Sequence, residues 1–125
     1  MMLVDTDVLI DFLRGRSEAV LFLRENIDRL SISAVSVAEL FQGVRDGEER
    51  TRLSTMISAF VVLPLTEEIA LAAGLYRRDF KATIGCGLAD CMIAATAVHH
   101  RSQLVSLNAK HFTMVEDVKI PYRKD

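Results

Sequence analysis

The stretch VDTDVLID, residues 4–11, places three aspartates, Asp5, Asp7 and Asp11, in a segment that is otherwise mostly apolar. It overlaps the apolar run MLV (2–4), which has the composition of a short buried strand. In an open α/β sheet, ligands bind beyond the carboxyl ends of the strands. Asp5 occupies that position. The role of its carboxylate therefore depends on which other residues reach the same edge of the sheet.

Three further short runs are apolar like MLV (2–4): SISAVS (31–36), VVLPL (61–65) and QLVSL (103–107). Their near-continuous hydrophobicity predicts strands that are buried on both faces of a parallel sheet. Helical patterns alternate with them over residues 17–30, which open with a Ser cap, and over 36–45, 48–59, 66–81 and 88–100. Gly85 and Gly87 break the chain before the last helix. The alternation predicts an α/β fold with a short, mainly parallel central sheet flanked by helices.

Length and composition predict a single domain over residues 1–125 with a normal core, because half of the 125 residues are hydrophobic. The net charge of −2 means that a polyanionic substrate needs local arginines or a bound cation. Cys86 and Cys91, five residues apart, fit neither a disulfide framework nor a CxxC pair. No signal peptide or membrane-length apolar run is evident, so we expect a cytoplasmic protein.

Polar residues follow several of the predicted strands and converge if those strands are neighbours. They are Asp5 after the first strand, Ser36 with Glu39 after the second, and Asn108 after 103–107. Asp90 joins them from the first turn of the most apolar helix. Three or four acids at one sheet edge repel one another unless a hard cation binds. Magnesium suits such a site, because it takes carboxylate oxygens and water and needs no His or Cys.

Local roles for the same residues remain open at this point. Asp90 has the position of a helix cap, and Ser36 and Glu39 have the spacing of a capping box. Asp5 is placed to cap a helix that begins near Asp7, and Asp11 to lie on a solvated helix face.

Four segments together resemble a known family: VDTDVLIDFL (4–13), SAVSVAELFQGV (33–44), GLADCMIAATAV (87–98) and LVSLNAKHF (104–112). They are similar, in order and spacing, to the signature segments of PIN-domain ribonucleases, in particular the VapC-type toxins of bacterial and archaeal toxin–antitoxin pairs. The resemblance covers almost the whole chain. It implies a PIN-like α/β/α sandwich and a Mg²⁺-dependent endoribonuclease, with Mn²⁺ able to substitute, in which metal-activated water hydrolyses the RNA phosphodiester bond.

The resemblance also implies roles for individual residues. Carried over by position, the acidic metal ligands are Asp5, Glu39 and Asp90. Asn108 falls where many relatives have a fourth acid, so it is a weaker contributor and leaves open whether one or two ions bind. Hydrogen-bonding support for the ligands would come from Thr6, Asp7 and Ser36.

Substrate and partners follow from the same resemblance. Basic residues near the motifs are candidates for the RNA backbone, although each is equally an ordinary surface charge: Arg14, Arg16, Arg45 and Lys110. The family implies a homodimer and a cognate antitoxin whose C-terminal segment lies across the active-site groove. Apolar helical faces at 17–30 and 48–60 are candidates to line that groove, and packing in the core is the alternative role for most of their residues.

Two other functions compete with this interpretation. LVDTDVLID (3–11) resembles the DxD motif of haloacid-dehalogenase-type phosphatases, but the sequence has no downstream acidic pair such as GDxxxD and is short for that family. The second competing function is that of a PIN-like module that binds RNA or protein without cutting RNA. The intact Asp5, Glu39 and Asp90 argue against it, whereas Asn108 keeps it open.

Overall fold

Four parallel strands form one sheet in the order β3-β2-β1-β4. The computed structural model describes residues 1–84 and 86–124. The strands are β1 (Met2–Val4), β2 (Leu30–Ser33), β3 (Val61–Leu63) and β4 (Gln103–Val105). Each of the four predicted strands is present, and the predicted parallel pairing is confirmed. The prediction of burial on both faces was wrong for β3, because this strand lies at the edge of the sheet and exposes Val61 and Val62.

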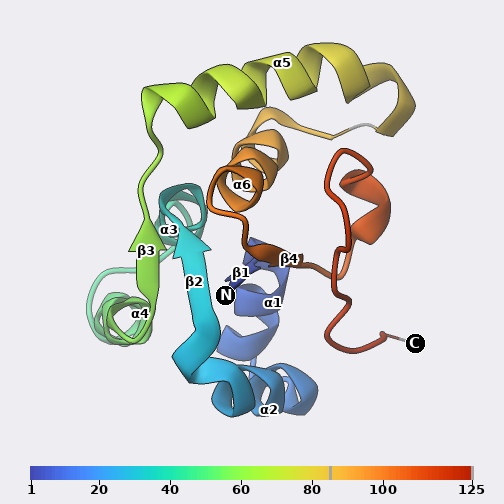
Figure 1. Ribbon diagram of the computed structural model, residues 1–125. Helices are drawn as coiled ribbons and strands as arrows, with labels where there is room; N and C mark the ends of the chain where they lie inside the picture. The colour runs from blue at the N-terminus through green and yellow to red at the C-terminus, as the bar shows by residue number, and fades with distance from the viewer. Residues whose placement is uncertain (85, 125) are drawn as a thin grey trace.

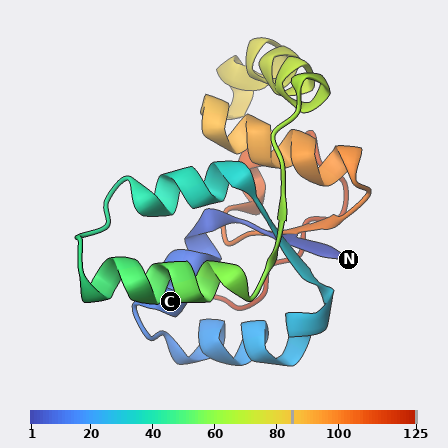
Figure 2. The ribbon, with the colours of Figure 1, turned by 90° about the vertical axis from the view of Figure 1, so that its left-hand side faces the viewer.

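Helices cover both faces of this sheet. They are α1 (Thr6–Leu13), α2 (Ser17–Asn26), α3 (Ala34–Phe41), α4 (Glu48–Ser58), α5 (Glu67–Ile84) and α6 (Leu88–His99), with short 3₁₀ helices η1 (Ile27–Arg29) and η2 (Ala109–His111). In Figures 1 and 2, α5 and α6 lie on one side of the sheet, and α1 and α2 lie on the other. This is the predicted α/β/α sandwich.

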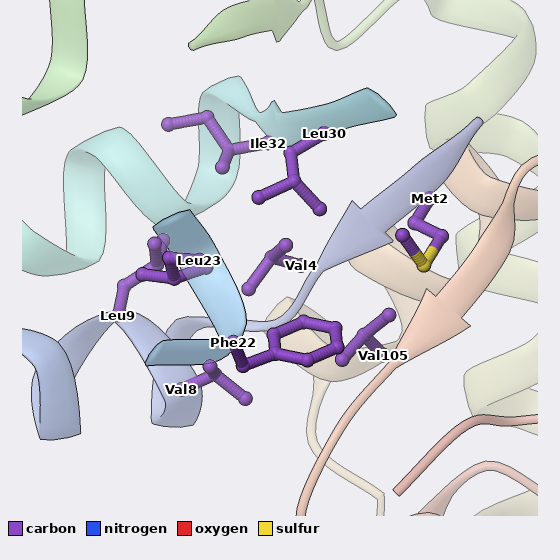
Figure 3. Close-up of a cluster of buried hydrophobic side chains, with 9 residues drawn as sticks. All are labelled: Met2, Val4, Val8, Leu9, Phe22, Leu23, Leu30, Ile32 and Val105. Atoms are coloured by element: carbon purple, nitrogen blue, oxygen red, sulfur yellow. The ribbon is translucent and has the colours of Figure 1, made fainter. Parts of the chain in front are cut away.

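Alternate strand residues supply two separate parts of the core. Figure 3 shows the first, in which Met2 and Val4 of β1 pack with side chains from α1, α2, β2 and β4: Val8, Leu9, Phe22, Leu23, Leu30, Ile32 and Val105. Leu3 and Leu104 point to the opposite face and pack against Ile93, Ala94 and Ala97 of α6. Both faces of the central strands are therefore buried, which explains why the strand runs are apolar without alternation.

The boundary between β2 and α3 differs from the prediction. The strand ends at Ser33 rather than Ser36, and α3 begins at Ala34. The cause is local, because the Ser33 hydroxyl accepts a hydrogen bond from the backbone N–H of Val35 at 3.0 Å and caps the helix. Ser36 therefore lies inside α3, and the proposed capping box of Ser36 and Glu39 was wrong.

Other helix boundaries also differ, since α3 ends at Phe41 rather than at 45 and α5 continues to Ile84 rather than ending at 81. Ser17 is the first residue of α2 rather than its cap, which is Arg16, and the helix gives way to η1 after Asn26. The predicted break at Gly85 lies outside the described residues. Within the part of the chain that is described, no helix combines the length and apolar character needed to cross a membrane.

Candidate metal centre

The carboxyl ends of β1, β2 and β4 bring the predicted polar residues to one edge of the sheet, because β1 lies between the other two strands. Asp5 follows β1 directly and is only 5% exposed. Its Oδ1 accepts a hydrogen bond from the backbone N–H of Thr6 at 2.8 Å, and its Oδ2 accepts one from the Ser106 hydroxyl at 2.8 Å. Asp5 is therefore the N-cap of α1, as one alternative held. Each carboxylate oxygen still has a second lone pair for another partner.

Thr6 connects this edge to α3. Its hydroxyl donates to Oε1 of Glu39 at 2.7 Å and lies 2.8 Å from the Ser36 hydroxyl. Since Thr6 has a single hydroxyl proton and gives it to Glu39, Ser36 must be the donor in the second bond. The chain Ser36–Thr6–Glu39 fixes the Glu39 carboxylate relative to Asp5, the residue next to Thr6.

Asp7 holds the loop that follows β4. Its Oδ2 accepts hydrogen bonds from the backbone N–H of Leu107 at 3.0 Å and from the side-chain amide of Asn108 at 3.2 Å. Its Oδ1 is buried and has no hydrogen-bond partner among the described residues. Asp7 thus positions Asn108, and it keeps one acceptor atom unused.

Burial and mutual repulsion dominate the electrostatics of the acids. Burial raises the pKa of Asp5 to about 7, with further increases from the charges of Asp7 and Asp90, against the opposing effect of the Ser106 and Thr6 hydrogen bonds. Burial likewise raises the pKa of Asp7. Asp90 is partly buried in the first turn of α6, and its negative charge is the weakest of the influences on the pKa of Asp5.

The donor set suits a hard cation. The acids and amide present oxygen ligands, and a positive charge would relieve the desolvated carboxylates of Asp5 and Asp7. Among residues 1–84 and 86–124, no three His, Cys, Asp or Glu side chains are close enough to hold an ion as they stand. Repulsion between carboxylates favours such separation. The arrangement fits Mg²⁺, which commonly binds one or two carboxylates and keeps several waters.

Asp11 does not lie on a solvated helix face, as the sequence had suggested. It is 5% exposed, because the C-terminal segment folds back over α1. The Tyr122 hydroxyl donates to Oδ2 of Asp11 at 2.7 Å, and the Lys124 ammonium donates to Oδ1 at 2.9 Å. Burial acts to raise the pKa of Asp11, but these two hydrogen bonds and the charges of Lys124 and Arg16 hold it below its ordinary value.

Removing this anchor should destabilise the fold. We expect Asp11→Ala to lower the free energy of unfolding by about 1–3 kcal/mol, because Tyr122 and Lys124 lose a shared partner. Urea denaturation at pH 7 measures the change. Asp28→Ala on the exposed η1 is the matched control and should stay within about 0.5 kcal/mol of the wild type. An unchanged stability for Asp11→Ala would show that Asp11 does not hold the C-terminal segment.

The four predicted RNA-binding side chains have different surroundings. Arg14 is exposed and lines a groove of about 500 Å³ together with Glu39. Lys110 is exposed on η2, two residues after Asn108. Arg16 forms an ion pair with Glu18 at 3.1 Å and lies 5.4 Å from the centre of the Tyr122 ring, whereas Arg45 approaches Glu49 at 3.9 Å. Arg14 and Lys110 are thus the better placed of the four.

Sequence reasoning missed two residues that organise this edge. Ser106 is fully buried, donates to Asp5 and accepts from the backbone N–H of Asn108 at 3.0 Å. The available signal was its position, because it interrupts the apolar run QLVSL where the strand ends. Tyr122 gave no comparable signal, since its partner Asp11 lies 111 residues away.

Comparison with known proteins adds to this geometry. A family model described as "PIN domain" matches residues 2–116. Ribonuclease VapC10 of Mycobacterium tuberculosis is 43% identical over 125 residues, which cover 98% of this chain and 93% of the relative. The chain belongs to the PIN-domain family, among its VapC-type members. Ribonuclease VapC19 of the same organism is 35% identical to this VapC-type PIN domain, covering 98% of it and 100% of the relative.

Solved structures show the same fold. A toxin–antitoxin complex from Klebsiella pneumoniae contains a chain with a TM-score of 0.86 and 30% identity, covering 99% of this VapC-type PIN domain and 100% of that chain. FitAcB from Neisseria gonorrhoeae gives a TM-score of 0.78 and 29% identity over 97% and 98% of the two chains. The acids described above therefore lie on a fold that also occurs in toxin–antitoxin complexes.

Proposed function

We propose that the protein is a Mg²⁺-dependent endoribonuclease, the toxin component of a type II toxin–antitoxin pair. The observation that carries the proposal is the placement of Asp5, which is buried at the central strand end with the neighbouring charge of Asp90 and a hydrogen-bonded link through Thr6 to Glu39. Relatives at 35–43% identity are named ribonucleases, which supports RNA as the substrate. The relatives and the acids together favour a nuclease over a phosphatase.

Each residue of the site then has a distinct task. Asp5, Glu39 and Asp90 would hold the cation, and the side-chain oxygen of Asn108 would assist. The bonds from Ser106 to Asp5 and from Thr6 to Glu39 keep two of these carboxylates oriented. When bound, Mg²⁺ supplies Lewis acidity at the scissile phosphate and a more acidic water as the nucleophile. Because water attacks, the chain needs no Ser, Cys or His nucleophile, and the products carry 5′-phosphate and 3′-hydroxyl ends.

Cleavage of a structured RNA by the purified protein tests this function. We expect cleavage with Mg²⁺ or Mn²⁺, none with a chelator, and 5′-phosphate ends by end-labelling. Cleavage that persists in the chelator would contradict the metal mechanism. RNA binding without any cleavage would instead favour the non-catalytic module.

Thr6 allows a narrower test of how the ligands are held. Thr6→Val keeps the shape of the side chain but removes its bonds to Glu39 and Ser36. We expect Mg²⁺ binding to weaken about 10- to 100-fold, as for other changes to groups that orient metal ligands. Calorimetric titration with Mg²⁺ measures the affinity. Thr96→Val is the matched control, since Thr96 is buried but bonds only the backbone of its own helix at Met92. Equal losses in both variants would refute the role of Thr6.

An antitoxin is the proposed protein partner. The helical faces predicted at 17–30 and 48–60 meet at a groove of about 730 Å³ between α1, α2 and α4. Among the described residues, the lining of this groove contains none of Asp5, Glu39 and Asp90, so these faces do not line the groove of the metal centre, as the sequence had suggested. Its apolar lining includes Phe12, Leu13, Val20, Leu23, Ile27, Met56, Ala59 and Phe60. Such a groove fits one face of an amphipathic helix. Co-expression with the candidate antitoxin should inhibit the Met56→Glu variant less strongly than the wild-type protein. Equal inhibition of the two proteins would exclude this groove as the antitoxin site.

A homodimer is proposed for the face formed by β3 and α5. The edge strand and the helix expose apolar side chains, namely Val61 (56%), Val62 (39%), Leu65 (41%), Leu71 (65%) and Leu75 (42%). Several exposed apolar side chains on neighbouring segments are typical of association sites. Sedimentation equilibrium should give twice the chain mass, and a monomer at micromolar concentration would exclude the proposal. Like its family, the protein would act in the cytoplasm.

A further inference from the structure

Residues 119–124, here called the C-terminal strap, close one side of the candidate metal centre. The strap pairs with β4, because the backbone N–H of Lys119 donates to the carbonyl of Leu104 at 2.8 Å and that of Ser106 donates to the carbonyl of Lys119 at 3.0 Å. It then crosses to α1, where Tyr122 and Lys124 are anchored on Asp11. In Figure 1 the strap runs beside the sheet on the β4 side. Both of its ends are thus fixed.

A cavity of about 340 Å³ lies between the strap and the metal centre. Its lining has three kinds of surface: apolar walls from Leu107, Ile120 and Tyr122, polar groups from Asp7 and Asn108, and positive charge from Arg123 and Lys124. The volume is at the small end of the range for ligand pockets. It is suited to one flat ring system with a sugar rather than to a folded macromolecular surface.

Two residues on this lining, Asp7 and Arg123, carry a polar group that lacks a partner within the described chain. Oδ1 of Asp7 is a buried acceptor without a hydrogen bond. A buried acceptor of this kind is costly unless a ligand or water donates to it. Arg123 is exposed and takes part in no hydrogen bond or ion pair among residues 1–84 and 86–124. Within the described part of the chain, the lining of the cavity therefore includes Asp7, whose carboxylate keeps an unused acceptor, and Arg123, which is an unpaired cation.

We infer that this cavity binds one nucleotide of the RNA, next to the bond that is cut. The base packs between Leu107 and Tyr122, a base N–H donates to the Asp7 carboxylate, and Arg123 pairs with the backbone phosphate. Tyr122 is a rigid wall, because Asp11 holds its hydroxyl and Arg16 lies over its ring. The inference rests on the proposed function for its substrate class. The cavity shares Asp7 and Asn108 with the metal centre, which places the bound nucleotide beside the scissile phosphate.

Binding of nucleoside 5′-monophosphates to the metal-free protein tests the pocket without any catalysis. The full chain, labelled with ¹⁵N and kept in a chelator, is titrated with each of the four monophosphates while its amide resonances are followed by NMR. We expect saturable shifts at Leu107, Asn108 and Tyr122. Arg123→Glu should weaken binding at least about fivefold, because an attraction to phosphate becomes a repulsion. Arg101→Glu is the matched control, since Arg101 is exposed just before β4, at the opposite end of that strand, and should leave the affinity unchanged.

The outcomes separate this inference from the proposed function. Absence of saturable shifts at these amides, or equal binding by Arg123→Glu and wild type, overturns the pocket even if the protein cuts RNA. If Arg123→Glu fails to fold, Arg123→Ala answers the same question. Retained nucleotide binding with no Mg²⁺-dependent cleavage would refute the nuclease and leave the pocket standing. With RNA substrate, Arg123→Glu should raise KM while kcat changes less than about twofold, and a loss confined to kcat also overturns the inference.

Discussion

Replacement of Asp5 by Asn is expected to reduce Mg²⁺-dependent RNA cleavage by at least about 10³-fold, a loss of about 4 kcal/mol in transition-state stabilisation. The substitution removes one negative charge from the centre of the site and keeps the size of the side chain. The amide oxygen can still accept from the backbone N–H of Thr6, and the Ser106 hydroxyl can accept from the new amide group. The loss should therefore come from metal binding and chemistry rather than from misfolding.

The same variant should be more stable than the wild type when metal is absent. A buried carboxylate beside Asp7 and Asp90 is costly in its charged form, whereas the amide that replaces it is neutral. Thermal unfolding in a chelator at pH 8 should thus give a higher Tm for Asp5→Asn, whereas Asp28→Asn on η1 should change neither Tm nor cleavage. Cleavage by Asp5→Asn within tenfold of the wild type would refute the role of Asp5 as a ligand.

The second large effect is on the pH dependence of stability. We expect the metal-free wild type to lose stability as pH rises from about 4 to about 8, by on the order of 3–4 kcal/mol. Asp5 has a pKa of about 7 in the folded chain, against an ordinary value of 3.8. Between these values the folded state keeps a proton that the unfolded state has released, so the free energy of unfolding must fall with rising pH.

The other acids do not reverse this sign. Burial raises the pKa of Asp7, which adds to the loss in the same direction. The pKa of Asp11 is lowered, so its contribution to stability is lost only as pH falls below about 4, outside this window.

Urea denaturation between pH 4.5 and 8 in a chelator measures the effect, and two comparisons assign it to the metal centre. Asp5→Asn should flatten the profile. Saturating Mg²⁺ at pH 8 should restore the lost stability to the wild type, since the ion binds only the folded chain. A wild-type profile that rises from pH 5 to pH 8 in the chelator would show that Asp5 is already ionised and would remove the basis for the prediction.

The sequence predicted β1, β2 and β4 well, because a strand covered on both faces must be apolar throughout. In runs such as MLV and QLVSL, three to five residues are enough to show this continuous hydrophobicity. It also predicted that Asp5 and Glu39 approach one another, since parallel strand ends share an edge. The start of α3 was missed because two serines, Ser33 and Ser36, were both chemically suitable caps, and strand length decided between them.

The C-terminal strap and its contacts lay beyond pattern reasoning. Asp11 looks like a solvent-facing helix residue, and only the return of the chain at Tyr122 buries it. The pairing of Lys119 with Val105 likewise involves one isolated bridge with no periodic run of its own. Contacts of this kind join segments that are far apart in the sequence, and their positions depend on the whole fold. Hydrophobic periodicity indicates only which face of a single segment is buried.

The position of β1 in the sheet has a consequence for the timing of activity during synthesis. The strand made first is flanked by β2 and by β4, and Asp5 reaches its full environment only when Ser106 is in place. A growing chain therefore presents the first acid long before the hydrogen bonds and the neighbouring strand that orient it. Closing this long loop carries an entropic cost that contacts near in sequence do not have. If the proposed function holds, a chain that has not yet reached β4 would lack the Ser106 bond that orients Asp5 and should not cut RNA.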